Sequence, residues 1–214
     1  DIFIGDEQKD LLLYNESTIN GPHRIHPVHH SFILMHGGID VPPEYKNYPR
    51  FPVELVDINK FDLPKKFVVI GPGTTKPICN IPGYTYEKIF QYCKNKGYEV
   101  VLLGKKYEFN VGSKNNPFMI GPKMEPINTE QCINLIDQTT LDETVAILDK
   151  AHCYIGPEGG LMNLCGMTDT PMVIGISGWE PKYRMPIRYN EIGWKAYPVM
   201  PDESLKCRFC IQKH

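Results

Sequence analysis

The sequence predicts an α/β protein with a Rossmann-like, doubly wound parallel sheet. Three observations lead to this fold class: strand-like and helix-like segments alternate from residue 66 onward, the strand-like segments are almost continuous apolar runs, and glycines follow several of these runs. Strands that are buried on both faces of a parallel sheet have this continuous apolar character. The helices between them provide the crossover connections.

Two strands and one helix are predicted in the first part of this region. The run KFVVIGPG is rich in β-branched residues and ends in glycines. A run of this kind is typical of a strand that is buried on both faces of a sheet. In YTYEKIFQYCKNKG, the side chains of Tyr86, Ile89, Phe90 and Cys93 recur at helical spacing, and Gly97 is a typical helix stop. YEVVLLG is then predicted as the next buried strand.

The second part continues the alternation. After a loop rich in glycine, asparagine and proline, CINLID is predicted as a strand and TTLDETVAILDKA as a helix. Thr140 is the expected N-cap, and Glu143 completes a capping box three residues later. Leu141, Val145 and Leu148 are expected to share the buried face of this helix. HCYIG and PMVIGIS follow as strands, with GGLMNLCGMT between them as a short helix.

The first 65 residues differ from this pattern. The proline-rich stretch DVPPEYKNYPRFPVELVD is predicted to be a linker or a segment that lies across a domain surface. The histidines before it have no Asp, Glu or Cys at ligand spacing, so they are expected to be solvated or hydrogen-bonded and not to bind a metal. These histidines are His23, His26, His29 and His30.

The composition is that of an ordinary globular protein. The 214 residues carry a net charge of −2, which gives no electrostatic reason to expect nucleic acid as a partner. No apolar run approaches the roughly 20 residues of a membrane-spanning helix. Five of the seven cysteines stand singly among apolar neighbours and are expected to be buried free thiols of a reducing compartment. Cys207 and Cys210 form the pair CRFC with only His214 nearby, so no closed metal site is expected.

Three loops are candidate ligand sites, because ligands of open α/β sheets bind at the carboxyl ends of the strands. GPGTTKP offers glycines, hydroxyls and Lys76 to a phosphate, although a simple Gly-Pro turn explains these residues equally well. It matches neither the GxGxxG nor the P-loop nucleotide motif. The second loop, LLGKK, contains Gly104. The third, GPEGG, is either a tight turn or a cradle in which Glu158 contacts a ligand and the following amides face an anion.

These motifs, in this order, resemble those of glycosyltransferase family 9, the bacterial heptosyltransferases and their relatives. The linker IHPVHHSFILMHGGIDVPPEY, the strand and loop VVIGPGTT and the long segment from INLIDQTTLDE to PMVIGISG each resemble a family motif, and CRFC resembles a cysteine pair found late in such chains. The resemblance covers most of the chain. It implies the donor-binding half of a two-Rossmann (GT-B) transferase, which moves a sugar from a nucleotide-diphosphate donor to an acceptor hydroxyl without an obligatory metal or other cofactor.

The resemblance also implies roles for individual residues. Thr74 and Thr75 would hold the diphosphate of the donor, with Lys76 as a nearby cation. Glu158 would bind hydroxyls of the donor sugar, while backbone amides stabilise the charge that develops on the leaving diphosphate. The other donor-site residues implied are Gly104, the base-pocket residues Leu135 and Ile136, the backbone donors Gly159, Gly160, Leu161 and Met162, and Asn163 in the following helix.

The chain departs from the family pattern at several of these positions. Glu158 stands where the family usually has Asp, and Asn163 stands where it usually has His. A family lysine of the phosphate loop falls on Cys79 or Asn80, which leaves Lys76 as a displaced substitute. No catalytic residue is assigned, because the family's general base belongs to an N-terminal Rossmann half for which too few residues precede the linker.

The resulting hypothesis is a glycosyltransferase that transfers a heptose-like sugar or a hexose to a glycan, a lipid-glycan or another hydroxyl acceptor. Residues 1–65 are assigned to the end of an acceptor domain and a linker, 66–200 to the nucleotide-sugar-binding domain and 201–214 to a tail. The rest of the acceptor site is expected on a missing N-terminal domain or a second subunit, and the protein in the cytoplasm or at a membrane periphery. Two alternatives stay open: a non-catalytic sugar-nucleotide or glycan-binding module, and an isomerase of the nucleotide-sugar 2-epimerase type.

Overall fold

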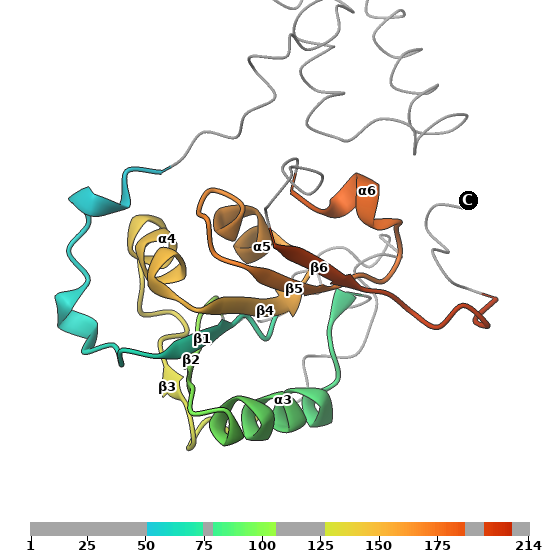
Figure 1. Cartoon of the computed structure of the whole chain (residues 1–214), viewed down its shortest axis with the longest axis horizontal. Coiled ribbons are helices and arrows are strands. Elements are labelled where there is room, and N and C mark those ends of the chain that lie inside the picture. Colours follow the sequence, from blue (N-terminus) through green and yellow to red (C-terminus); the bar gives the residue numbers. More distant parts are fainter. Residues whose placement is uncertain (1–50, 75–78, 106–126, 187–194, 207–214) are drawn as a thin grey trace, which may run out of the picture.

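A computed structural model describes residues 51–74, 79–105, 127–186 and 195–206 of the chain. Within these ranges, six strands form one sheet, and every neighbouring pair of strands is parallel (Figure 1). The strands are β1 (Phe67–Ile70), β2 (Glu99–Leu102), β3 (Ile133–Asn134), β4 (Cys153–Pro157), β5 (Met172–Gly175) and β6 (Ala196–Val199). The helices are α3 (Gly83–Asn95), α4 (Leu141–Lys150), α5 (Gly160–Cys165) and α6 (Pro181–Arg184), with 3-10 turns η3 (Val53–Leu55) and η4 (Asn59–Phe61).

The strands lie in the order β3-β2-β1-β4-β5-β6. This is the order of a Rossmann fold, in which the chain builds the sheet outward from β1 on one side and then returns to build outward on the other. Figure 1 shows α3 against one face of the sheet and α4 and α5 against the opposite face. The predicted doubly wound α/β fold is therefore confirmed, and the direction of winding reverses between β1 and β4.

Apolar layers cover both faces of the sheet. Val69 of β1 and Val101 of β2 belong to the layer that includes side chains of α4 and α5, whereas Val68 and Val100 belong to the layer that includes side chains of α3. All four side chains are at most 5% exposed. Successive residues of a strand point to opposite faces, so a strand that is covered on both faces buries every residue. This is why the strands read as continuous apolar runs in the sequence.

Helix α3 buries the face that its spacing predicts. Tyr86, Phe90 and Cys93 are each at most 3% exposed and pack in the same layer as side chains of β1 and β2. The chain leaves the helix through Gly97, which has a φ of +76°. This left-handed conformation is disfavoured for residues with a Cβ atom, so glycine at this position ends the helix at low cost.

Helix α4 begins with the predicted capping box. The Thr140 hydroxyl accepts from the Glu143 amide (3.2 Å), and the Glu143 carboxylate accepts from the Thr140 amide (2.9 Å). Val145 and Leu148 are buried as expected, but Leu141 is 71% exposed. The expectation for Leu141 is wrong because it is the first residue of the helix, and the buried face begins one turn later.

The substitution Thr140→Ala is expected to lower the free energy of unfolding by about 1 kcal/mol, because it removes the side-chain acceptor for an amide in the first turn of α4. Thr140→Ser is the matched control, since serine keeps the hydroxyl that accepts from the Glu143 amide and should cost less. Urea unfolding followed by circular dichroism measures both variants. Wild-type stability of Thr140→Ala would contradict the assigned cap.

The described part of the proline-rich segment packs on the domain. Turn η3 contacts α4, and the side chains of Val53, Val56 and Phe61 lie against the same core layer as α4 and α5. Lys60 pairs with Glu143 (2.5 Å), and the hydrogen bond from Lys60 lowers the pKa of this carboxyl. Residues 51–57 of the segment thus pack against the domain, in agreement with one of the two predicted interpretations, and the rest of the segment lies outside the described residues. The division of the chain into an acceptor remnant, a donor domain and a tail remains a prediction.

Two short elements, α6 and β6, carry no clear sequence signal. β6 is the last strand of the sheet, and its Pro198 stands opposite Ile174 of β5. Proline has no amide hydrogen and is tolerated in sheets mainly at edges. Tyr197 and Val199 are each 56% exposed, so β6 lacks the continuous apolar character of the inner strands. Helix α6 has only four residues, too few for a periodic pattern.

The five cysteines in the described ranges are free thiols, and three of the five have the predicted burial. Cys79, Cys93 and Cys165 are buried, whereas Cys132 and Cys153 are half-buried. Burial raises the pKa of Cys165 to about 12 and the pKa values of Cys132 and Cys153 to about 11. The folded protein therefore favours the protonated thiols at pH values at which an unfolded chain, with thiol pKa values of about 8.5, ionises them.

The free energy of unfolding is expected to fall as the pH rises above about 8.5. A raised folded-state pKa means that the stabilisation is complete below the unfolded pKa and is lost between the unfolded and the folded values. For Cys165 the loss between pH 8 and pH 9.5 is about 1 kcal/mol. Urea unfolding at the two pH values measures it, and Cys165→Ala should show a smaller pH dependence. If the free energy of unfolding of Cys165→Ala falls with pH as steeply as that of the wild type, the loss does not come from Cys165.

Several expectations fall on residues outside the described ranges, and they stay predictions. They concern the histidines His23, His26, His29 and His30, the loop residues Thr75 and Lys76, and Cys207, Cys210 and His214. Within the described ranges, no helix is both long and apolar enough to cross a membrane.

Candidate functional site at the β1–β4 crevice

The reversal of winding between β1 and β4 brings the first and third candidate loops together at the carboxyl edge of the sheet. The amide of Gly71, directly after β1, donates to the carbonyl of Ile155 in β4 (3.1 Å). Further along the loops, a Cβ atom at Gly159 would lie 3.5 Å from Thr74 Oγ1. Ligands of doubly wound sheets bind in the crevice at this point of the topology. The two loops therefore meet where the fold offers a ligand site.

Glycines let the two loops approach this closely. The ring of Tyr154, which is 1% exposed, lies across Gly71 and Gly156. A Cβ atom at Gly156 would stand 2.4 Å from the Tyr154 hydroxyl and 3.0 Å from the Gly71 carbonyl oxygen. Real Cβ atoms essentially never show the first distance, and the second is tighter than almost all real Cβ contacts, so the base of the crevice requires glycine for space and not for an unusual φ.

Glu158 is the charged centre of this edge of the sheet. Its side chain is 1% exposed. Oε2 accepts from Arg184 Nε at 2.6 Å, and Oε1 lies 3.3 Å from both Cys79 Sγ and Ser177 Oγ. A buried carboxylate needs such donors because it has lost its hydration. The sequence left open whether the GPEGG loop is a tight turn or a ligand cradle. In this structure, hydrogen-bond donors of the protein itself hold the Glu158 carboxylate.

These donors come from three separate parts of the chain. Cys79 follows β1, Ser177 follows β5 and Arg184 ends α6. They are 79, 19 and 26 residues away from Glu158, respectively. Sequence reasoning missed all three as site residues, because no short-range pattern connects them. The one available signal was that two of them follow strands predicted to end at the same edge of the sheet.

The other predicted residues of the GPEGG loop have mixed environments. Gly160 and Asn163 are exposed, Leu161 is half-buried, and Met162 is 1% exposed within the core. Leu161 Cδ1 lies 3.5 Å from the place of a Cβ atom at Gly104, so the second candidate loop adjoins the third. All three loops therefore reach the same region.

Two predicted residues after β3 belong to the core. Leu135 is 6% exposed and joins the layer that includes α4 and α5, whereas Ile136 is half-buried against the layer that includes α3. Thr74, in the first loop, is 8% exposed, and its amide donates to Asn80 Oδ1 (3.3 Å). The role of Leu135 and Ile136 in a base pocket remains a prediction.

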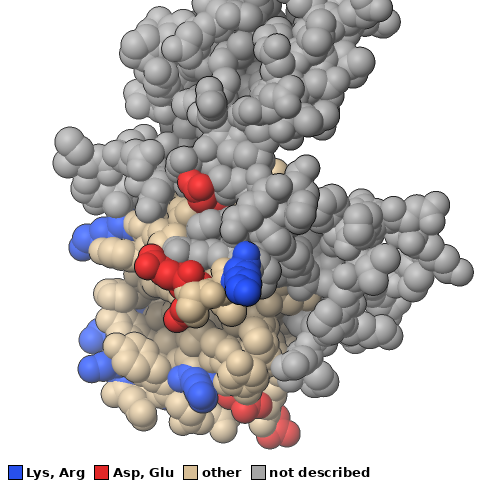
Figure 2. Space-filling view, turned by 90° about the vertical axis from the view of Figure 1, so that its right-hand side faces the viewer, with Lys and Arg blue, Asp and Glu red and all other residues tan. Residues whose placement is uncertain are grey.

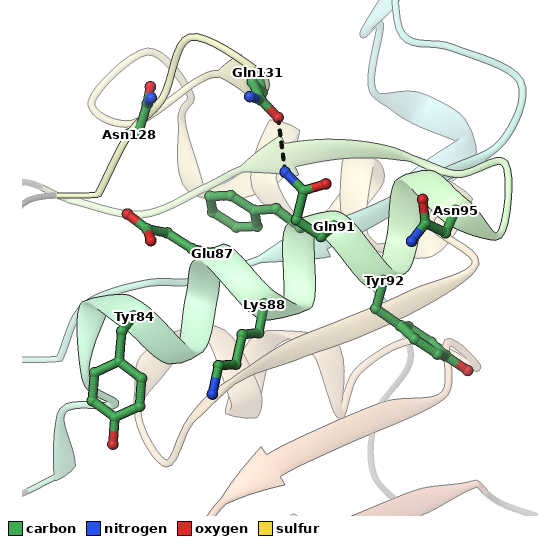
Figure 3. Close-up of a pocket in the computed structure, with 9 residues that line it drawn as sticks. Tyr84, Glu87, Lys88, Gln91, Tyr92, Asn95, Asn128 and Gln131 are labelled. Carbon is green, nitrogen blue, oxygen red and sulfur yellow. Dashed lines mark hydrogen bonds between the residues drawn. The ribbon is translucent and has the colours of Figure 1, made fainter.

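A groove of about 700 Å³ lies elsewhere, along the outer face of α3 (Figure 3). Gln91 of α3 reaches Gln131 across it, with the amides 3.5 Å apart, and Tyr84 and Lys88 also line it. A smaller hollow of about 450 Å³ adjoins η4 and the start of β1. Neither hollow contains a predicted site residue, so neither one supports the donor-site assignment.

Charge is mixed on the face shown in Figure 2. Lysine and arginine side chains, and aspartate and glutamate side chains, are interspersed with uncharged surface among the residues that are coloured there. This agrees with the small net charge of −2.

The strand order and the meeting of glycine loops at the winding reversal define a Rossmann-type ligand-binding domain. Residues 7–208 match the model of glycosyltransferase family 9 (heptosyltransferase). Because the match covers most of the chain, the chain belongs to this family, as the sequence motifs predicted.

Similar proteins agree with this assignment. Lipopolysaccharide heptosyltransferase 2 of Escherichia coli (strain K12) is 26% identical over 138 residues, which are 62% of this chain and 37% of the relative. The structure of E. coli ADP-heptose LPS heptosyltransferase II matches with a TM-score of 0.52 and 21% identity, over 77% of this chain and 45% of that chain. The dodecameric iron-containing heptosyltransferase TibC, in complex with ADP-D-β-D-heptose, matches with a TM-score of 0.62 and 15% identity, over 87% of this chain and 42% of that chain.

The similarity to these relatives covers only part of each of them. The chain spans less than half of the length of each of them. In the described part of this chain, no group of three or more His, Cys, Asp or Glu side chains could hold a metal ion.

Proposed function

We propose that this chain is the donor-binding half of a glycosyltransferase, which transfers a heptose-like sugar or a hexose from a nucleotide-diphosphate donor to an acceptor hydroxyl. The observation that carries the proposal is the meeting of the loops after β1 and β4 at the winding reversal, in a chain of glycosyltransferase family 9. Nucleotides bind at this crevice in Rossmann folds. The names of two similar structures include ADP-heptose or ADP-D-β-D-heptose, so an ADP-sugar is the first donor to test.

The reaction would be a direct displacement at the anomeric carbon. The acceptor oxygen forms the new bond, the bond from the sugar to the diphosphate breaks, and a base takes the acceptor proton. The leaving diphosphate gains negative charge, which preorganised donors stabilise. Thr74, Thr75 and Lys76 would provide such donors on one side of the crevice, and the amides that begin at Gly159 would provide them on the other. The base remains unassigned.

A second candidate function is a non-catalytic module that binds a sugar nucleotide. All of the residues that are assigned at the crevice would bind the donor, and such a module would need only these residues. Release of free nucleoside diphosphate in the presence of a glycan or lipid-glycan acceptor separates the two functions: a transferase releases it in an acceptor-dependent manner, and a binding module does not. We place the protein in the cytoplasm, and at the periphery of a membrane if its acceptor is a lipid-glycan.

Thermal shift with ADP-, UDP-, GDP- and CMP-sugars tests the proposed donor class. A ligand at about 100 times its dissociation constant stabilises the folded state by about 2.7 kcal/mol, which raises the melting temperature measurably. We expect one nucleotide class to stabilise the protein more than the others. Absence of a shift with all four donors, confirmed by calorimetry, would contradict the proposed function.

Gly160→Pro is expected to weaken donor binding by about tenfold, because it removes one amide from the third loop. Proline is tolerated at the first position of a helix, and Gly159 before it is extended (φ 166°, ψ −164°), so α5 should form unchanged. Gly160→Ala is the matched control: it keeps the amide, and its Cβ atom would have no atom within 4 Å. If calorimetry gives the same affinity for the nucleotide sugar in both variants, the Gly160 amide is excluded as a hydrogen-bond donor to the ligand.

A further inference from the structure

The buried carboxylate of Glu158 is a poor candidate for direct contact with a sugar. Its side chain is 1% exposed, and both of its oxygens already face protein donors. A sugar hydroxyl could reach it only by displacing Arg184 or Ser177. Displacement of Arg184 would separate a buried ion pair, which is costly because a charge is then left unpaired in the interior.

Arg184 differs from Glu158 in that it reaches solvent. Its side chain is 26% exposed, whereas that of its partner is 1% exposed. The ion pair is made through Nε, and a guanidinium has four further N–H donors on its two terminal nitrogens. An arginine that is anchored at one nitrogen by a buried acid is preorganised to present the other nitrogens to an anion, and its planar group matches phosphate geometry.

The position of this pair relates it to the candidate donor loops. Glu158 directly precedes Gly159, whose backbone lies against Thr74 in the first loop. The described residues of the loops that follow β1, β4 and β5, up to α6, include no lysine and no arginine. A diphosphate that was bound between these loops would otherwise meet the negative charge of Glu158. Arg184 both neutralises this charge and supplies a cation at the same edge of the sheet.

We propose that Arg184 is a further residue that binds the diphosphate of the donor, and that Glu158 is a positioning residue, which acts on the ligand through Arg184. This inference rests on the proposed function and deepens it. It replaces direct recognition of sugar hydroxyls by Glu158 with indirect recognition of the phosphates. It also explains why an acid is tolerated in an anion-binding loop: the acid and the arginine together carry no net charge, and the outer edge of the pair is cationic.

Calorimetry with ADP, ADP-glucose and AMP distinguishes the two roles of Glu158. If Glu158 positions Arg184, Glu158→Gln should lower the affinities for ADP and ADP-glucose by the same factor, about tenfold, and the affinity for AMP by less than about threefold. If Glu158 binds sugar hydroxyls, the same variant should weaken ADP-glucose and leave ADP unchanged, and this result would overturn the inference. If the wild type prefers another nucleotide, its diphosphate, diphosphate sugar and monophosphate replace these ligands.

Further variants separate a ligand contact from a purely structural role. Glu158→Gln/Arg184→Gln removes both charges and avoids a buried unpaired carboxylate. We expect it to weaken ADP by about 10- to 100-fold with little change for AMP, and Arg184→Lys to fall between this variant and the wild type. The control Lys88→Gln removes one positive charge from the outer face of α3 and should bind ADP normally.

A double-mutant cycle completes the test. Because Glu158 is proposed to act through Arg184, adding Glu158→Gln to Arg184→Gln should cost no further ADP affinity. Additive losses would overturn the inference, as would wild-type ADP affinity in the double variant. These results are distinct from failure of the proposed function, in which the wild type itself would bind none of the nucleotides and the inference would fall with it.

Discussion

Arg184→Ala is expected to lower the free energy of unfolding by about 3 kcal/mol. The substitution leaves the Glu158 carboxylate buried without the cation that lies 2.6 Å from it. Removing one partner of a buried ion pair typically costs about 3–5 kcal/mol, because the remaining charge is neither paired nor hydrated. The lower end of this range applies here, since Arg184 itself is 26% exposed and its charge is partly screened by solvent.

Urea unfolding of Arg184→Ala and of Glu158→Gln/Arg184→Ala measures this effect. The double variant has no buried charge left at this position, so it should recover much of the lost stability. Such a recovery would show that the unpaired carboxylate, and not the lost packing of the arginine stem, causes the loss. If the single variant were as stable as the wild type, the ion pair at the carboxyl edge would contribute nothing to the fold.

Gly156→Ala is expected to destabilise the protein by about 2 kcal/mol and to weaken ligand binding at the crevice. The added Cβ atom would stand 2.4 Å from the Tyr154 hydroxyl and 3.0 Å from the Gly71 carbonyl oxygen. Tyr154 is 1% exposed and has no solvent side to which it could move, and the carbonyl belongs to the backbone after β1. Overpacking of a dense core usually costs about 1–3 kcal/mol. Because β1 and β4 would have to separate, the loops that meet above them should shift as well.

The melting temperature and the ADP affinity of Gly156→Ala should therefore fall together. Tyr154→Phe added to this variant removes the hydroxyl that the new atom would meet first, so the double variant should be more stable than the sum of the single effects predicts. Gly160→Ala is the control substitution, since nothing lies within 4 Å of its added Cβ atom. Additive effects of the two substitutions would contradict the close approach described here.

Local sequence patterns predicted the elements that local physics decides. The capping box of Thr140 and Glu143 spans three residues, and both of its hydrogen bonds are present. The buried face of α3 follows from helical periodicity, and its end follows from the φ of Gly97. These features depend on neighbours in the chain, so a single sequence contains the information that they need.

The predictions failed where distant parts of the chain decide the outcome. Leu141 has the correct spacing for the buried face, but it is the first residue of α4 and stays exposed. Strand β6 contains Pro198, and its residues alternate between half-buried and exposed. It is a strand because its backbone pairs with the edge of β5. Periodicity does not report where a helix starts relative to its neighbours or which sheet edge is open.

The amino-acid sequence alone was sufficient to predict the fold class and the family, and it named the loops that meet at the winding reversal. Continuous apolar strands and glycine loops specify a doubly wound sheet, and such a sheet places its crevice at the winding reversal. The environment of Glu158, by contrast, is a product of the folded arrangement. Its partners Cys79, Ser177 and Arg184 are 79, 19 and 26 residues away, and they meet it because parallel strands end at one edge of the sheet. The charge state and the reach of a side chain depend on burial and on such long-range partners, and neither can be read from neighbouring residues.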